Sequence, residues 1–112
     1  STRREGSKME FDTKSVKLLS DYSGPEIEQI ETNLRNLYAT KAGTQPLDRE
    51  FGLDINFVGD PLPVAKSKFT LEVVRKTATY EPRVKVTEVT YEEDGENGML
   101  IPSIHLEKGG DA

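Results

Sequence analysis

The acidic side chains are the residues of this sequence whose type and number could do chemistry. The 112 residues include 20 Asp and Glu, and two carboxylates about 5 to 10 Å apart suffice for glycoside hydrolysis. Glu50, Asp54, Asp60 and Glu81 are the candidates. So many carboxylates in a small domain will meet that spacing by chance, and the sequence has no Trp to line a polysaccharide cleft. We therefore predict no enzymatic activity, with a lysozyme-type hydrolase as the minor alternative.

Nucleophilic, metal and phosphate chemistry lack the residues that they need. The sequence has no cysteine, and its one histidine, His105, lies in a predicted strand, so a Ser–His or Cys–His pair is not indicated. Zinc sites take three or four nitrogen or sulfur ligands, and neither a phosphate-binding glycine loop nor an EF-hand motif is present. We predict no cofactor, no metal and no small-molecule substrate.

The charge balance argues against two further classes of partner. The net charge is -5, from 15 Lys and Arg against 20 Asp and Glu, which gives no large positive field for a phosphate backbone or an anionic membrane. No apolar run approaches the roughly 18 to 20 residues of a membrane span. We expect neither nucleic acid nor a membrane to be bound, which leaves other proteins as the predicted partners.

The segment Glu81-Pro82-Arg83 is the most informative short motif. Pro82 disfavours helical geometry at Glu81, so a preceding helix must end there and the chain continues extended, with Glu81 and Arg83 on one side. One interpretation is a structural corner in which Arg83 bonds loop carbonyls and Glu81 pairs locally. The other is an interface anchor, a role that arginine often plays.

Two helices are predicted before this corner. In residues 25–40 the apolar positions form one stripe, with Ser23 or Gly24 as the cap and Gly43 as the stop signal; they are Ile27, Ile30, Leu34, Leu37 and Tyr38. Asp60 and Pro61 predict the start of a second helix that ends near Tyr80.

The second helix has an unusually broad apolar surface. One stripe consists of Val64, Leu71, Val74 and Ala78, and beside it lie Ala65, Phe69, Val73 and Tyr80. Either the sheet and the first helix both cover this surface, or one side awaits a partner. Residues 42–63 predict a loop anchored by apolar side chains, with a short strand at Leu53, Ile55 and Phe57.

Two strands, residues 84–92 and 99–106, are predicted to form a hairpin around the turn sequence of residues 94–98. The parity of the apolar residues changes within the first strand, which indicates a bulge or burial on both faces. Pro102 cannot donate to a ladder, so we expect the second strand to lie at an edge or to contain a bulge. Residues 10–19 predict a short strand or extended arm.

These elements predict an α+β fold in which two helices pack on a small, mainly antiparallel sheet with a C-terminal β-hairpin. We expect one domain over residues 9–108, a disordered polar segment over residues 1–8 that precedes a natural start at Met9, and a polar tail over residues 109–112.

Several short segments together resemble a known family, the phage baseplate wedge proteins called sheath initiators, which are often labelled tail lysozymes and have relatives in type VI secretion. The matching segments run in the family's order over residues 27–91: Leu37-Tyr38-Ala39-Thr40, Gly43-Thr44-Gln45-Pro46-Leu47, Phe51-Gly52-Leu53-Asp54 and Tyr80-Glu81-Pro82-Arg83-Val84.

The resemblance implies a structural role in a contractile tail. Glu81, Pro82 and Arg83 would dock on the helical core bundle of the wedge, and charge reversal at Arg83 would abolish docking without unfolding the domain. The terminal hairpin would template sheath subunits by strand addition, a contact that we place at Leu100, Pro102 and Ile104 on the predicted edge strand.

The family also sets the remaining expectations. It implies several copies in each baseplate, assembly in the bacterial cytoplasm and a final place in a phage tail or an equivalent contractile machine. The alternative is an anti-adaptor of the same fold, which would bind a protease-delivery factor.

Overall fold

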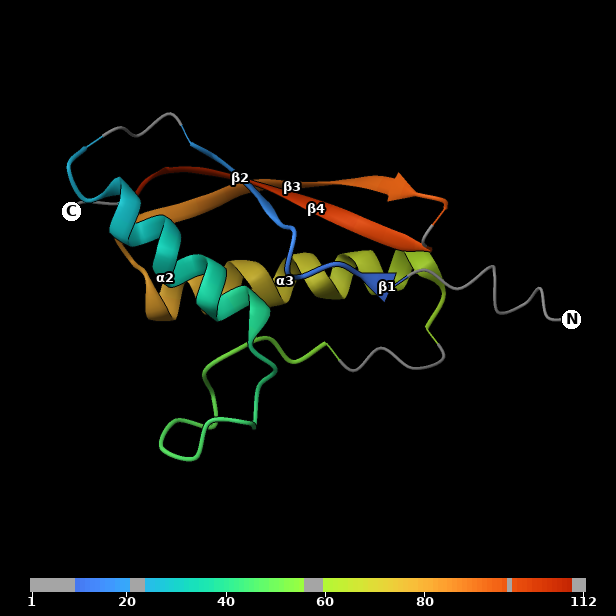
Figure 1. Cartoon of the computed structure of the whole chain (residues 1–112), viewed down its shortest axis with the longest axis horizontal. Helices are drawn as coiled ribbons and strands as arrows, with labels where there is room; N and C mark the ends of the chain where they lie inside the picture. The colour runs from blue at the N-terminus through green and yellow to red at the C-terminus, as the bar shows by residue number, and fades with distance from the viewer. Residues whose placement is uncertain (1–9, 21–23, 56–59, 97, 110–112) are drawn as a thin grey trace, which may run out of the picture.

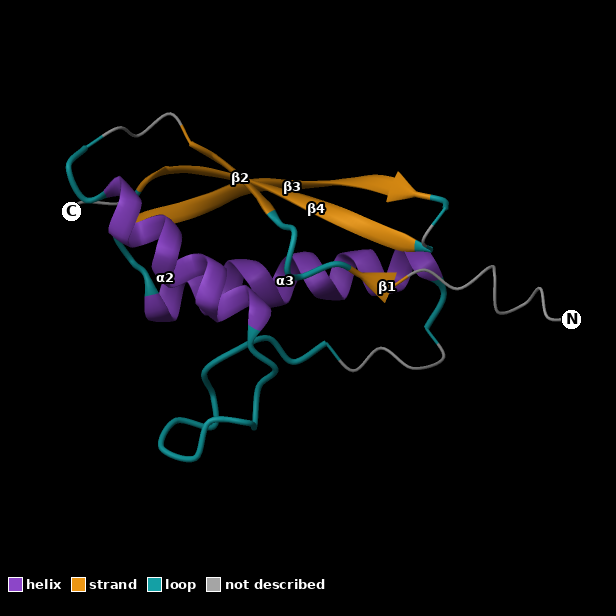
Figure 2. Cartoon of the chain, in the orientation of Figure 1, coloured by secondary structure: helices purple, strands orange, loops and turns teal. Residues whose placement is uncertain are grey.

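A computed structural model of the chain describes residues 10–20, 24–55, 60–96 and 98–109. The elements follow in the order β1 (Glu10–Phe11), β2 (Lys17–Ser20), α2 (Ile27–Ala39), α3 (Leu62–Tyr80), β3 (Val84–Asp94) and β4 (Met99–Lys108), as Figures 1 and 2 show. The predicted α+β class, both helices and the terminal hairpin are confirmed. Residues 1–9, Ser23, Phe57, Asn97 and residues 110–112, which carried predictions, lie outside the described residues.

The sheet is mixed instead of mainly antiparallel. β4 lies at its centre, with β3 antiparallel on one side and the short strands β1 and β2 parallel to it on the other. The hairpin supplies the long antiparallel pairing, from Val84 opposite Lys108 to Asp94 opposite Met99. The two parallel pairings arise because the N-terminal segment returns alongside β4, which the local sequence pattern does not reveal.

The expectation that β4 is an edge strand is wrong, and Pro102 shows why a proline is tolerated there. β1 pairs with Met99 and Leu100, whereas β2 pairs only from Ser103 onward. Asp12 donates its N–H to the carbonyl oxygen of Leu100 at 2.8 Å, and alternate residues of a strand direct their backbone groups to the same side. Pro102 therefore directs its missing donor to the gap between β1 and β2, where no ladder bond is lost.

The predicted bulge in β3 is confirmed. The register with β4 shifts between Val86 and Glu88, so Thr87 is the extra residue. Val86 then lies opposite Leu106 and Val89 opposite Ile104. The bulge therefore keeps apolar residues of both parities on the face that packs against the helices.

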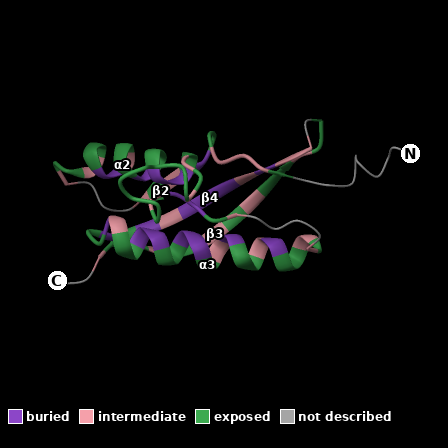
Figure 3. Cartoon of the chain, turned by 90° about the horizontal axis from the view of Figure 1, so that it is seen from below, coloured by how far each residue is buried: buried purple, intermediate pink, exposed green. Residues whose placement is uncertain are grey.

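Both helices lie on one side of the sheet, and the core fills the space between (Figure 1). The expected stripe of α2 is buried at Ile30, Leu34, Leu37 and Tyr38. It meets Phe69 and Val73 of α3 and apolar residues of the hairpin. Figure 3 shows that buried and exposed segments alternate along each helix, as expected when only one face of a helix packs.

The helix ends differ in detail from the predicted caps. Pro61 is the N-cap residue of α3 and no side chain caps the helix; the predicted cap, Asp60, instead forms an ion pair with Lys68 at 2.9 Å. α2 ends at Ala39, and Thr40 is its C-cap residue. Gly43 does adopt a positive φ of 94°, but in the following turn instead of at the helix terminus.

The loop between the helices is anchored as predicted, although Leu53 forms an isolated parallel bridge with Lys41 and not a strand. Leu53 is fully buried, and Phe51 and Ile55 pack against the core. Gly52 has a φ of 108°, and a Cβ there would lie 2.6 Å from the carbonyl oxygen of Thr40. Only glycine fits this close crossing of the two ends of the loop.

Candidate partner-binding site

The Glu81–Arg83 corner is built around a two-pronged ion pair. α3 ends at Tyr80, and the N–H of Glu81 still bonds to the carbonyl oxygen of Thr77 at 2.8 Å. Arg83 then donates from Nε to Oε1 of Glu81 at 2.6 Å and from Nη2 to Oε2 at 2.8 Å. The predicted extended continuation is not observed: Pro82 and Arg83 form a turn, in which the N–H of Val84 bonds to the carbonyl oxygen of Glu81 at 3.3 Å.

The corner also holds α2 in place. Asn33 of α2 donates from Nδ2 to Oε2 of Glu81 at 3.1 Å, and Nη1 of Arg83 donates to Oε1 of Gln29 at 3.2 Å. The hydrogen bonds from Arg83 lower the pKa of the Glu81 carboxyl; burial opposes this shift, and Asn33 adds to it. Glu81 therefore stays ionised although its side chain is only 4% exposed.

This geometry gives the three predicted docking residues different roles. Glu81 is buried and its carboxylate is already bonded by Arg83 and Asn33, so it has a structural role. The local pairing of Glu81 that the structural interpretation expects is observed, with Arg83 as the partner. Pro82 is exposed and the Arg83 side chain is 41% exposed, so these two residues can still contact a partner.

The three residues predicted on β4 have a different place. Leu100, Pro102 and Ile104 are fully buried, on the central strand of the sheet. Their side chains belong to the interior of this chain, so a partner strand cannot pair beside them without displacing β1, β2 or β3. The free sheet edge that we predicted on this strand is therefore not on β4.

The long free edge of the described sheet is on β3. This strand of 11 residues pairs with β4 on one side only among the described residues. Leu100 directs its backbone groups toward β1, so its neighbours on alternate positions, Ile101 and Ser103, direct theirs toward β3. There they lie opposite Glu92 and Thr90. The intervening residue Tyr91 and, by the same alternation, Val89 and Glu93 direct their backbone groups outward. A second strand can pair there.

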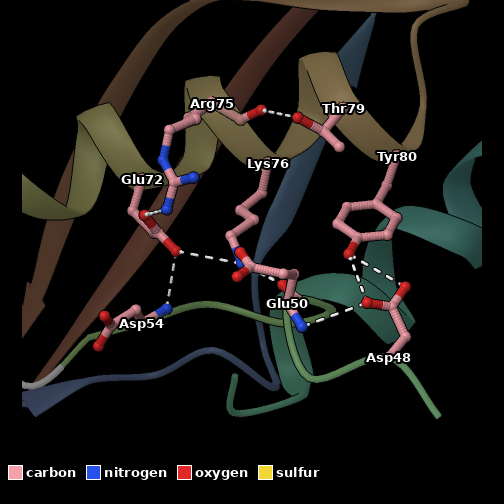
Figure 4. A network of polar contacts seen from close by, with 8 residues as sticks. All are labelled: Asp48, Glu50, Asp54, Glu72, Arg75, Lys76, Thr79 and Tyr80. Carbon is pink, nitrogen blue, oxygen red and sulfur yellow. Dashed lines mark hydrogen bonds and ion pairs between the residues drawn. The ribbon is translucent and has the colours of Figure 1, made fainter. Parts of the chain in front are cut away.

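Sequence reasoning missed the polar network that fixes the loop to α3 (Figure 4). Lys76 and Glu72 are both buried and their charged groups lie 3.7 Å apart. Lys76 also donates from Nζ to the backbone oxygen of Glu50, and Oε2 of Glu72 accepts the N–H of Asp54 at 2.8 Å. The one signal in the sequence is that these two residues fall within the apolar face of the helix, at an i, i+4 spacing suited to an ion pair.

The end of the same loop is held by Tyr80. Its hydroxyl donates to both carboxylate oxygens of Asp48, at 3.0 and 3.1 Å, and its ring meets that of Phe51 edge to face at 5.2 Å. The loop therefore has a fixed base on α3 while Leu47, at its tip, is 99% exposed.

The four carboxylates considered for glycoside hydrolysis lie in three places: the end of α3, the start of α3 and the loop between the helices. Glu81 has a lowered pKa, whereas the general acid of a glycosidase needs a raised one. Asp60 is paired with Lys68, and Asp54 and Glu50 belong to the loop that the network fixes. Among the described residues no group of three or more His, Cys, Asp or Glu is arranged to hold a metal ion.

Comparisons with known proteins show a similarity of fold only. No family model and no curated protein matches the sequence. The fold is similar to that of a Geobacter sulfurreducens protein assigned as a candidate tail lysozyme, with a TM-score of 0.50 and 15% sequence identity, over 81% of this chain and 97% of that one. Within the described residues, no helix combines the length and hydropathy that crossing a membrane requires.

Proposed function

We propose that this protein is a non-enzymatic assembly component of a contractile-tail baseplate, which joins wedge proteins and begins sheath assembly by strand addition. The observation that carries the proposal is the outward-facing backbone of β3, a long strand paired on one side only in the described sheet. Such an edge accepts an extended segment of another chain through main-chain hydrogen bonds.

The free edge has features of a controlled interface. Glu88, Glu92 and Glu93 are exposed along β3, and charged residues on an edge strand suppress pairing with chance partners. Glu92 already pairs with Lys17 at 3.1 Å, so a partner strand that supplies Lys or Arg opposite Glu88 and Glu93 would be favoured over a neutral one. The acidic edge therefore supports selective recognition of one strand.

The second contact of the proposal is the exposed part of the corner. Pro82 and the outer side of Arg83 are accessible, while the ion pair with Glu81 fixes their position. A rigid arginine binds a partner at a lower entropic cost than a mobile one. In the assembled tail, this corner would dock on the helical core of the wedge, after synthesis in the bacterial cytoplasm and in several copies per baseplate.

The candidate tail lysozyme of similar fold supports a tail-related role because of its assigned name. We propose that this chain shares the association with a tail without the hydrolysis. Of the four carboxylates considered for hydrolysis, Glu81 is held by Arg83 and Asp60 is paired with Lys68, which does not favour either as the general acid that the hydrolytic mechanism uses.

The test is recovery of partners from the native host by tagged wild-type protein and two variants. Glu93→Pro removes an outward N–H from the edge and adds a ring there, whereas Glu93→Ala removes the same side chain and keeps the N–H. We expect wild type and Glu93→Ala to recover wedge and sheath proteins, and Glu93→Pro to lose the sheath protein alone. Pro82→Asp should instead lose the wedge proteins.

Three results contradict the proposal. Equal recovery of sheath by Glu93→Pro would remove the role of the β3 edge. Recovery of a protease-delivery factor in place of tail proteins would favour the anti-adaptor alternative. Cleavage of peptidoglycan by the purified protein, lost in a Glu50→Gln or Asp54→Asn variant, would show that a lysozyme was wrongly rejected.

A further inference from the structure

The outer face of α3 carries an unusual run of exposed apolar side chains. Five large hydrophobic residues of the described chain are exposed, and three of them lie on this helix: Val64 at 42%, Leu71 at 68% and Val74 at 40%. Ala78 is exposed as well. The buried residues of α3, such as Phe69 and Val73, lie on the opposite face, so the helix is apolar on two sides.

The exposed residues follow the spacing of a coiled-coil seam. Val64, Ser67, Leu71, Val74 and Ala78 are separated by three, four, three and four residues, which is the a and d pattern of two heptads. With Val64 at an a position, Leu71 and Ala78 are also a positions, and Ser67 and Val74 are d positions. A helix that only covers its own sheet does not need this second seam.

The two charged side chains that flank the seam on α3 itself are both basic. Lys68 and Arg75 occupy the two e positions, and their side chains are 52% and 61% exposed. Glu72 is the one acidic residue of α3, and it is buried against the loop. These two flanking cations, on a chain whose net charge is -5, can pair with acidic e and g positions of a partner helix.

The ion pairs that Lys68 and Arg75 already make leave room for such a partner. Lys68 bonds one oxygen of Asp60, and Arg75 bonds Glu72 through Nη2 alone. Both cationic side chains remain more than half exposed, so each still has a side that faces solvent. A second carboxylate can therefore share these cations at little cost.

We infer that the seam of α3 binds an amphipathic helix of another protein that has an apolar a and d face and acidic flanking residues. A second copy of this chain fits poorly. Antiparallel pairing of two such seams brings the basic e positions together, and parallel pairing offers them no carboxylate, because Thr70 is uncharged and Thr77 is buried. The seam consists of α3 side chains and includes neither the backbone edge of β3 nor Pro82, so the inference does not rest on the proposed function.

The test is an NMR titration of the full chain with two synthetic helical peptides of two to three heptads. Both peptides have Leu and Val at a and d; one has Glu at every e and g position, and the other has Lys. A seam this short predicts a weak contact, below the size of a stable interface, which NMR shifts can measure. We expect the acidic peptide to bind and to shift the amides of residues 64–78, and the basic peptide to bind at least tenfold more weakly.

Two variants and one control locate the contact. Leu71→Ser should weaken binding of the acidic peptide roughly tenfold or more, because the variant lacks the leucine side chain that the peptide would bury. Lys68→Glu with Arg75→Gln should weaken it about fivefold, because two exposed charge pairs are lost. Leu47→Ser removes the most exposed leucine, at the loop tip, and should change nothing.

Other outcomes overturn the inference. Failure of the acidic peptide to bind, equal binding of the two peptides, or shifts centred on β3 would each exclude an acidic helix on this seam. A concentration-dependent dimer of the free protein that Leu71→Ser abolishes would identify a second copy as the occupant instead.

Discussion

Arg83 reaches back over Pro82 to hold Glu81 with two hydrogen bonds, of 2.6 Å from Nε and 2.8 Å from Nη2. The carboxylate lies at the end of α3 and is also bonded by Asn33 of α2, so one ion pair connects both helices to the start of β3. The motif stabilises the tertiary structure and is also a candidate contact with a partner. The two roles must be separated by experiment.

Charge reversal at Arg83 should destabilise the isolated domain. Arg83→Glu would place a second carboxylate beside the buried one, and breaking a buried ion pair costs about 3 to 5 kcal/mol; since Arg83 is partly exposed, we expect the lower end of that range. Arg83→Lys keeps the charge but loses the two-pronged hydrogen bonding of the guanidinium, so it should lower the free energy of unfolding by less. Urea unfolding measures both. An unchanged midpoint for Arg83→Glu would show that the corner adds nothing to stability and serves partners alone.

The same ion pair predicts a loss of stability in acid. The pKa of Glu81 is lowered from 4.5 in the folded chain, so its contribution is complete above the unfolded-state pKa and is lost as the pH falls through the folded-state pKa. The difference in unfolding free energy between wild type and Glu81→Gln should be constant from about pH 7 to pH 5 and should shrink toward pH 3. A difference that grows in acid would contradict the assignment.

A buried hydroxyl pair between the helices should be sensitive to the loss of either partner. The hydroxyl groups of Tyr38 and Thr77 lie 2.6 Å apart, both residues are buried, and burial raises the pKa of Tyr38 to about 12. Tyr38→Phe should cost about 1 to 2 kcal/mol, because Thr77 is left without a partner, whereas Tyr38→Phe with Thr77→Val should recover much of the loss. Thermal unfolding of the three variants checks this; additive losses would contradict it.

The loop between the helices should loosen when its polar anchor is removed. Lys76→Met keeps most of the side-chain volume but removes the cation that bonds the backbone of Glu50 and faces Glu72. We expect a loss of about 2 kcal/mol or more, because Glu72 remains buried with Arg75 as its one cation.

Hydrogen exchange distinguishes local loosening from global loss of stability. The N–H groups of Ala42 and Leu53, which bond across the base of the loop, should exchange faster in Lys76→Met than the central amides of β4. Lys68→Met, which removes an exposed partner of Asp60, is the matched control and should leave the loop amides unchanged. Equal acceleration of loop and β4 amides in Lys76→Met would contradict a local role.

The sequence by itself determined the elements whose signals are local. The stripe of α2, the start of α3 near Pro61, the hairpin and the bulge in β3 all follow from side-chain periodicity and turn residues, which act over a few positions. It also showed that α3 has more apolar surface than one contact needs. The motif at residues 81–83 was found because a proline fixes the backbone regardless of what surrounds it.

Only the tertiary structure decided which strand is central and which contacts are interior. The sequence predicted β4 as an edge because Pro102 lacks a donor, but the return of residues 10–20 in two pieces leaves a gap opposite that proline. Burial of the Lys76–Glu72 pair likewise depends on a loop that crosses α3 from more than 20 positions away. Pairing between distant segments is set by the packing of the whole chain. A local sequence pattern therefore predicts which residues can be buried, but it does not predict which segments cover them.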